Sequence, residues 1–261
     1  MEAPATRDSA GETLAVLYAD ESLVAVCKPA GTFVHRTRLD ARVGDSALAQ
    51  AREAAGGDYL YPVHRLDRGT SGLLLFATTP AVQRRLADDF AERRVEKTYL
   101  AVVRGWPPPR GIIDTPLARL TDDGDRRRDV EPQEATTRFT TLGHSELPVR
   151  VDRYPTSRYA LVQAAPLTGR RHQVRRHLRK INHPLVGDTT YGNGRHNRHF
   201  RTAFGIHRLL LAAVALTITH PATGLPLVLE APLATDFWSA LVALDLTTAV
   251  PARWRPAADR L

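Results

Sequence analysis

The chain has 261 residues, a formal net charge of +8 at pH 7 and a single cysteine, Cys27. This length fits one large domain, and one cysteine excludes a disulfide framework. The sequence contains no apolar run of membrane-spanning length, and its polar, acid-containing first residues are unlike a signal peptide. We therefore expect a protein of the cytoplasm that makes no contact with membranes.

Apolar periodicity and turn residues predict strands and helices along the whole chain. Val82, Leu86 and Phe90, for example, are four residues apart, as on one face of a helix, and Pro80 stands near its start. In chain order we expect two strands within 14–31, a helix over 45–56 capped by Asp45 or Ser46, a strand over 73–77, a helix over 80–94, strands over 97–105 and 159–166, a helix over 168–181, and two strands within 209–232.

Three segments are expected to lack regular structure. Residues 121–132 have no apolar anchor and read as a mobile loop. Residues 192–205 read as a basic loop flanked by glycines, and residues 251–261 as a loosely held end. Because strands outnumber helices and no repeat or linker divides them, the pattern predicts a single α+β domain.

The positive charge is concentrated in one part of the chain. Residues 168–201 contain nine basic residues and one acid, Asp188, so this segment alone carries a balance of +8 and the remainder is neutral. Solvated charge runs usually mix signs, so the segment indicates a surface for phosphates, as in nucleic acid. The alternative is a codon bias toward arginine, because lysine occurs only at Lys28, Lys97 and Lys180.

The segment HRLDRGTSG, residues 64–72, places one carboxylate, Asp67, between Arg65 and Arg68 in a turn before an apolar strand. Asp67 either caps this turn, as most loop aspartates do, or acts as a nucleophile or base. The neighbouring cations would keep it ionised. A hydrolysing glycosidase usually needs two carboxylates across the bond, and the motif supplies only one.

Metal and nucleotide chemistry find little support in the sequence. His172 and His177 are five residues apart, so they do not share a helix face as the histidines of a zinc motif do. The sequence also lacks a GxGxxG motif and a Walker loop. We therefore expect neither a metal nor a cofactor.

The motif HRLDRGTSG matches the H-R-L-D-x-x-T-S-G segment of the RluA family of RNA pseudouridine synthases, and the chain resembles this family over most of its length. Further segments that resemble family motifs, in the family's order, are EKTYLAVVRG, PLTGRRHQVRRHL, HPLVGDTTYG and HRLLLAAVALTITHP. Within the family, VHRTRLD, RYPTSRYALV and GRHNRHF resemble the tRNA pseudouridine(65) synthase branch. One departure is Ala212, where the family usually has histidine.

This resemblance implies the pseudouridine synthase fold, with a mixed, mainly antiparallel central sheet flanked by helices and an RNA-binding cleft. It also implies a reaction in which the N1–C1′ bond of a uridine breaks, the base turns, and a C5–C1′ bond forms. Because nothing is hydrolysed, one carboxylate suffices. Whether this carboxylate attacks C1′, attacks C6 or assists loss of the 2′-proton stays open.

The resemblance also implies roles for single residues. Asp67 matches the family's catalytic aspartate, Tyr99 its active-site tyrosine, and Arg175 the arginine that pairs with the aspartate. The residues alone leave Tyr99 open as a core tyrosine and Arg175 as a surface helix arginine. Arg65 matches an arginine that enters the RNA when the uridine leaves its stack, and phosphate contact is its alternative role. The residues expected to contact RNA are His64, Arg65, Arg68, Arg170, Arg171, Arg195 and Arg198.

The expected substrate is a tRNA, with a 23S rRNA uridine as the alternative. A non-catalytic RNA-binding or ribosome-assembly protein is the rival class of function, although binding alone gives no reason for an acid at Asp67. We expect a monomer whose catalytic domain spans 13–245 between tails at 1–12 and 246–261. The S4 RNA-binding module carried by many family members is not expected.

Overall fold

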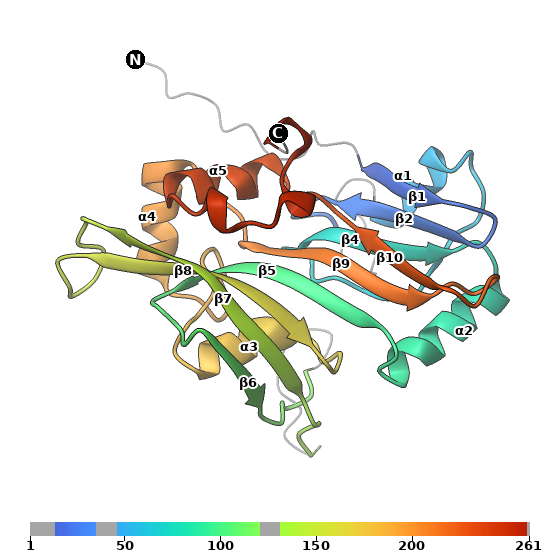
Figure 1. The fold of residues 1–261 in the computed structure, drawn as a ribbon, viewed down its shortest axis with the longest axis horizontal. Coiled ribbons are helices and arrows are strands. Elements are labelled where there is room, and N and C mark those ends of the chain that lie inside the picture. Colours follow the sequence, from blue (N-terminus) through green and yellow to red (C-terminus); the bar gives the residue numbers. More distant parts are fainter. Residues whose placement is uncertain (1–13, 35–45, 121–130, 260–261) are drawn as a thin grey trace.

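The computed structural model describes residues 14–34, 46–120 and 131–259, and their strands form a single sheet (Figure 1). The strands are β1 (Ala15–Ala19), β2 (Leu23–Lys28), β3 (Tyr61–Pro62), β4 (Ser71–Ala77), β5 (Glu96–Arg104), β6 (Arg110–Asp114), β7 (Thr136–Leu147), β8 (Ser157–Pro166), β9 (Leu211–Thr219) and β10 (Pro226–Glu230). The helices are α1 (Ala47–Ala54), α2 (Pro80–Ala91), α3 (Gln173–Lys180), α4 (Gly194–Phe204) and α5 (Thr235–Ala243).

The sheet has the strand order β1-β2-β4-β9-β5-β8-β7-β6, with β10 paired to β9 and β3 paired to β4. All these pairs are antiparallel except β4 with β9, which run parallel where Ser71 faces Ala212 and Gly72 faces Ala213. Only glycine fits at position 72, because φ is +101° and a Cβ would lie 2.0 Å from the carbonyl oxygen of Ala213. The expected mixed, mainly antiparallel sheet flanked by helices is confirmed.

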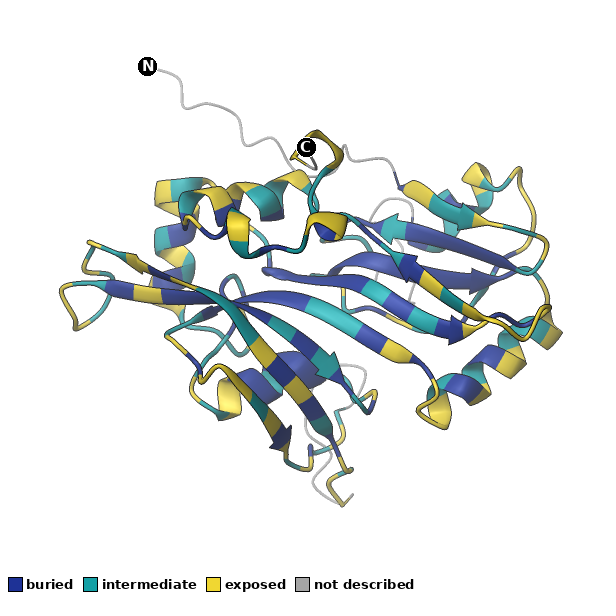
Figure 2. Cartoon of the chain, viewed as in Figure 1, coloured by how far each residue is buried: buried dark blue, intermediate teal, exposed yellow. Residues whose placement is uncertain are grey.

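Helices cover both faces of the sheet. One face carries α2, α4 and α5, whose Leu86, Phe200 and Phe237 pack onto it. The other face carries α1 and α3, through Ala51 and Leu178. Successive residues of a strand point to opposite faces, and here both faces are covered, so the central strands are buried along most of their length (Figure 2).

Most of the elements expected from apolar periodicity are present. The two strands within 14–31 are β1 and β2, which form a hairpin. Ser46 caps α1, since its hydroxyl accepts a hydrogen bond from the backbone N–H of Ala49 at 3.3 Å. The other expected cap, Asp45, lies outside the described residues. Pro80 is the first residue of α2, where its missing N–H leaves no helical hydrogen bond unmade.

The helix expected over 168–181 begins later, as α3. Its first residue, Gln173, accepts hydrogen bonds through its side-chain oxygen from the hydroxyl of Thr168 at 2.7 Å and the backbone N–H of Arg170 at 2.9 Å. These bonds fold the preceding residues into a turn. The turn ends at His172, whose backbone is left-handed, with φ 56° and ψ 26°.

The segment 192–205 contains the helix α4, so the expectation of a basic loop is wrong. The helix is capped at both ends by residues suited to the task. The side chain of Asn193 accepts hydrogen bonds from the backbone N–H groups of Arg195 and His196, and Gly205 ends the helix in the left-handed conformation. The flanking glycines and asparagine are therefore helix boundaries.

The residues on the buried face of α4 explain why apolar periodicity did not predict this helix. This face consists of His196, Phe200 and Phe204, four residues apart, and a histidine does not count as apolar in a periodicity search. In the structure His196 is buried, and its Nδ1 lies 2.8 Å from the hydroxyl of Tyr159. Tyr159 also packs edge-on against Phe200 at 5.0 Å between ring centres. The hydrogen bond between His196 and Tyr159 thus allows a polar residue to occupy a position of α4 that is usually apolar.

Residues 251–255 are not loosely held, so the expectation of a loosely held end is wrong for this part of 251–261. Trp254 is only 2% exposed and packs in the core with Leu246 and Val250. Its indole N–H donates a hydrogen bond to Oε1 of Glu230 at 3.1 Å. The sequence did not predict this packing, because the prolines and the few apolar residues of the segment form no helix or strand pattern. Of the expected mobile loop at 121–132, all but the last two residues lie outside the described ranges.

Candidate active site

Asp67 lies in the loop between β3 and β4, just before β4 meets β9 in parallel. Two backbone hydrogen bonds fold this loop. The N–H of Thr70 donates to the carbonyl of Asp67 at 3.0 Å, and the N–H of Gly31 donates to the carbonyl of Arg68 at 2.8 Å. Every residue of β4 is buried. The carboxylate is therefore attached to a rigid part of the core.

Lys28, the last residue of β2, joins the motif loop to the preceding turn. Its side chain is fully buried, and its Nζ donates to the carbonyl oxygens of Pro29 at 2.7 Å, Thr32 at 2.9 Å and Arg68 at 3.2 Å. Burial lowers the pKa of this ammonium group to about 7. Sequence reasoning missed Lys28, because a single buried lysine leaves no periodic signal.

Arg175, on α3, reaches Asp67 from a segment 108 residues away. Its Nη1 donates to Oδ2 of Asp67 at 3.1 Å. Its Nε and Nη2 form a fork on Asp188, at 2.7 Å to Oδ2 and 2.9 Å to Oδ1. The guanidinium therefore bridges two carboxylates, of which Asp188 is fully buried and Asp67 is 18% exposed.

The charges of this group stabilise one another. Although burial disfavours its charged form, the carboxylates of Asp188 and Asp67 raise the pKa of Arg175 above its usual value. Burial likewise opposes ionisation of Asp188, but the hydrogen bonds from Arg175 hold its pKa below the usual value. Arg175 thus remains a fixed cation that orients the more accessible carboxylate.

Tyr99, on β5, lies beside this group at the junction of the two halves of the sheet. It is opposite Ala164 on β8 and Ala213 on β9, and it packs against the apolar clusters under both α1 and α3. Burial raises the pKa of its hydroxyl above the usual value, and the negative charge of Asp67 adds to the effect. The phenol is therefore protonated at neutral pH and presents a half-buried, flat ring.

The other motif residues divide between the surface and the interior. Arg65 and Arg68 are exposed, and the guanidinium of Arg68 lies over the ring of Phe33 at 4.6 Å. His64 instead points inward. Its Nε2 accepts a hydrogen bond from the backbone N–H of Leu75 at 3.1 Å, and its ring stacks on Phe90 at 4.9 Å.

Burial lowers the pKa of His64 to about 4, so its imidazole is neutral at pH 7. Its contacts are those of a residue that holds the loop, and its expected role in RNA binding stays a prediction.

The remaining arginines expected to contact RNA lie in two places. Arg170 and Arg171 precede α3 and are half-buried, and Nε of Arg170 donates to the carbonyl of Glu134 at 2.9 Å. Arg195 and Arg198 are exposed on α4. Arg195 forms an ion pair with Asp152.

The helix α4 packs against the face of the sheet opposite to α3. Asp67 pairs with Arg175 and lies near His172 rather than with Arg195 or Arg198, whose contact with RNA remains a prediction.

Three residues near Asp67 were not assigned a role from the sequence. Asp188 fixes Arg175; in the sequence it was the single acid of a basic segment and part of the motif HPLVGDTTYG, but no role was assigned to it. His172 places its Nε2 3.8 Å from Oδ1 of Asp67, and its Nδ1 lies 3.0 Å from the hydroxyl of Tyr191. An acid that interrupts a run of arginines is thus a usable signal for a buried ion pair.

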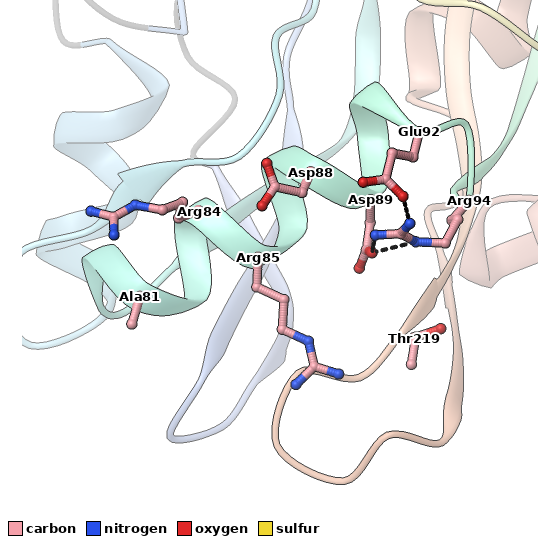
Figure 3. A pocket seen from close by; sticks show the side chains of 8 residues that line it. All are labelled: Ala81, Arg84, Arg85, Asp88, Asp89, Glu92, Arg94 and Thr219. Carbon is pink, nitrogen blue, oxygen red and sulfur yellow. Dashed lines mark hydrogen bonds and ion pairs between the residues drawn. The ribbon is translucent and has the colours of Figure 1, made fainter.

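A hollow of about 580 Å³ lies along α2 and does not belong to this site (Figure 3). Thr219, at the far end of β9 from the Ser71–Ala212 pair, lines it. Within the hollow, Arg94 pairs with Asp89 and Glu92, and Arg85 donates to the carbonyl of Pro221. Within the described ranges, no cluster of three metal-ligating side chains occurs, and no helix is long and apolar enough to cross a membrane.

Known proteins similar to this chain are RNA pseudouridine synthases, in agreement with the arrangement of Asp67, Tyr99 and Arg175. Residues 22–180 match the family described as RNA pseudouridylate synthase. The chain is 42% identical over 233 residues to tRNA pseudouridine synthase C of Vibrio cholerae, covering 88% of this chain and 95% of that protein. It is 45% identical over 214 residues to tRNA pseudouridine synthase C of Pasteurella multocida, covering 81% and 88%.

Solved structures give the same result. Human RNA Pseudouridylate Synthase Domain Containing 4 has a TM-score of 0.67 and 25% identity, over 88% of this chain and 93% of that chain. Human RNA Pseudouridylate Synthase Domain Containing 1 has a TM-score of 0.63 and 26% identity, over 95% and 98%. The matched motifs, the fold and the extent of these similarities lead to one conclusion: the chain belongs to the RluA-type family of RNA pseudouridine synthases, enzymes that isomerise uridine in RNA.

Proposed function

We propose that this protein isomerises a uridine of tRNA, of the position 65 type, and that Asp67 is the catalytic residue. The observation that carries the proposal is the group Asp67–Arg175–Asp188. It holds one partly accessible carboxylate in a fixed orientation beside the ring of Tyr99. The other carboxylate of the group is fully buried and bound at both oxygens, so it has no free edge for a substrate.

The chemistry requires a site that retains a freed base and excludes water. The N1–C1′ bond breaks, the uracil turns, and C5 bonds to C1′ while C5 loses its hydrogen as a proton and N1 gains one. Asp67 acts at the sugar or at the base in this exchange. Tyr99 supplies a flat surface on which the uracil stacks, and its protonated hydroxyl can donate a hydrogen bond.

The uridine reaches Asp67 by leaving its stack in the RNA. Arg65 lies two residues before Asp67 on the same loop and is exposed, which suits a side chain that fills the vacated place. Arg68 is also exposed on this loop. Arg170 and Arg171 precede α3, which packs on the same face of the sheet as the loop with Asp67, and in this proposal they contact neighbouring phosphates.

The choice of tRNA is supported by relatives of 42–45% identity that are named tRNA pseudouridine synthase C. The segments RYPTSRYALV and GRHNRHF, which marked the tRNA branch in the sequence, also contact each other through the hydrogen bond between Tyr159 and His196, and Arg195 of the second segment forms an ion pair with Asp152, which immediately precedes the first.

Mapping of pseudouridines in cellular RNA tests the proposal. Carbodiimide-dependent primer stops are compared in tRNA and rRNA from cells with the gene, without it, and with an Asp67→Asn copy. We expect one tRNA stop that disappears without the gene and returns only with the wild-type copy. Loss of an rRNA stop alone would overturn the choice of tRNA, and full restoration by Asp67→Asn would overturn the role of Asp67.

A further inference from the structure

His172 has an unusual backbone for a residue with a side chain. Its φ of 56° and ψ of 26° lie in the left-handed region, which few residues other than glycine adopt, although asparagine, aspartate and histidine do so more often than the rest. Strained backbone of this kind persists only where the surroundings hold it, and it concentrates at functional sites. The residue immediately precedes α3, the helix that carries Arg175. The turn therefore aims an imidazole at a specific place.

The imidazole lies between Tyr191 and Asp67. Its Nδ1 is 3.0 Å from the hydroxyl of Tyr191, and its Nε2 is 3.8 Å from Oδ1 of Asp67. The Tyr191 ring meets the His172 ring edge-on at 5.6 Å between ring centres, and the guanidinium of Arg175 lies 5.1 Å from the centre of the Tyr191 ring. The backbone N–H of Tyr191 is bound to Asp188. Tyr191 is thus held by the same ionic group that orients Asp67.

The surroundings decide which nitrogen of His172 carries the proton. Burial lowers its pKa to about 4, although the charge of Asp67 acts in the opposite direction, so the ring is neutral at pH 7 with a single N–H. A lone pair on Nε2 would face the carboxylate of Asp67 and be repelled by it. The N–H therefore belongs on Nε2, and the Tyr191 hydroxyl donates to Nδ1.

We propose that His172, fixed by Tyr191, is a positioning residue that donates its Nε2–H to Oδ1 of Asp67 when RNA fills the site. The proposal rests on the proposed catalytic role of Asp67. In the free protein the 3.8 Å separation is too long for a hydrogen bond, but catalytic hydrogen bonds often close only with substrate bound. The carboxylate is then held at both oxygens, by His172 at Oδ1 and by Arg175 at Oδ2.

Two substitutions at position 172 distinguish the hydrogen bond to Asp67 from the effect of the left-handed backbone conformation. Asparagine accepts the left-handed conformation but is too short to reach Asp67, whereas glutamine fits the backbone less well and carries an amide N–H about as far as Nε2. If His172 served only to shape the turn, His172→Asn would be at least as active as His172→Gln. The proposal predicts the reverse order.

Tyr191→Phe provides a second variant that keeps the ring and removes only the hydroxyl. The test measures single-turnover release of tritium from tRNA labelled at uridine C5, together with the dissociation constant for the same RNA and the midpoint of urea unfolding. A misplacement of about 1 Å can lower a rate roughly 100-fold. We expect a loss of about that size for His172→Asn, a smaller loss for Tyr191→Phe, partial recovery in His172→Gln, and unchanged RNA affinity in all three.

NMR of the histidine side chains reports the tautomer of His172, which a purely structural role of this residue would not determine. In protein labelled with ¹⁵N-histidine, the signals that vanish in His172→Asn belong to His172. We expect the Nε2–H tautomer at pH 7 in the wild-type protein and a mixture of tautomers in Tyr191→Phe. The Nδ1–H tautomer in the wild type would overturn the proposal, as would His172→Asn reacting as fast as His172→Gln.

The variant Asp67→Asn is measured beside these proteins. If it reacts at the wild-type rate, the proposed function of Asp67 fails, and the role of His172 fails with it. If Asp67→Asn is inactive while His172→Asn and Tyr191→Phe react at the wild-type rate, only the role of His172 is wrong.

Discussion

Replacing Asp188 with asparagine should destabilise the fold strongly, because it removes the charge that balances Arg175 in the interior. The carboxylate is fully buried and accepts two hydrogen bonds from Arg175, and it also accepts the backbone N–H groups of Thr190 and Tyr191, each at 2.9 Å. Asparagine keeps the shape but turns one acceptor into a donor. Removing one partner of a buried ion pair typically costs about 3–5 kcal/mol, a large share of the stability of a domain.

Urea unfolding followed by tryptophan fluorescence measures the loss. The matched control is Glu134→Gln, which breaks an exposed ion pair with Arg93, because surface pairs contribute little to stability. We expect the midpoint of Asp188→Asn to fall well below that of the control. A variant as stable as the control would refute the reasoning that Asp188 balances a buried cation.

The loss of stability in Asp188→Asn should also depend on pH. Although burial favours the neutral carboxyl, the hydrogen bonds from Arg175 hold the pKa of Asp188 below its usual value. A carboxyl with a lower pKa in the folded chain adds stability that is fully present above its unfolded pKa, about 3.9, and is lost as the pH falls through the folded pKa. The difference between wild type and Asp188→Asn should therefore be constant from neutral pH down to about 5 and shrink in more acid solution. A constant difference into strong acid would contradict this.

Three further predictions follow from the packing and the charges. Lys28→Met leaves the carbonyl oxygens of Pro29 and Thr32 in the preceding turn, and of Arg68 in the motif loop, without their donor. It should therefore lower both stability and single-turnover rate, whereas the exposed Lys180→Met should change neither. Arg195→Ala with Arg198→Ala should flatten the dependence of log K on log salt by about 1.4 units if both contact phosphates of single-stranded RNA, and an unchanged slope would place them in solvent. Trp254→Ala should lower the free energy of unfolding by about 3–5 kcal/mol, and a loss as small as that of a surface substitution would contradict its place in the core.

The pairing of Asp67 with Arg175 could be predicted from the sequence only through the family motifs. The two residues are 108 positions apart, and no local spacing links them. In the structure α3 and the motif loop meet on one face of the sheet, where β4 and β9 run parallel. The resemblance to the family predicted the contact between Asp67 and Arg175, whereas apolar periodicity predicted the strand and the helix that carry or flank these residues.

Other parts of the site gave no periodic signal. Lys28 and Asp188 each act as single buried charges, and one residue creates no pattern in a sequence. The helix α4 was hidden because His196 takes an apolar position by way of its bond to Tyr159. The left-handed His172 breaks the expected helix, and only a backbone structure reveals that break. Apolar spacing therefore predicted most of the strands and helices, but it missed β6, β7, α4 and α5, and it predicts buried polar contacts poorly.

The most direct test of the account is the release of tritium from tRNA labelled at uridine C5 by purified protein, because C5 loses its hydrogen only when the new C5–C1′ bond forms. Wild type is compared with Asp67→Asn and with Asp58→Asn, an exposed aspartate nearby in the sequence, at RNA concentrations that saturate each protein. The account predicts release by wild type and Asp58→Asn, and none by Asp67→Asn although it still binds the RNA. Release by Asp67→Asn at the wild-type rate would contradict the central claim that this carboxylate carries out the isomerisation.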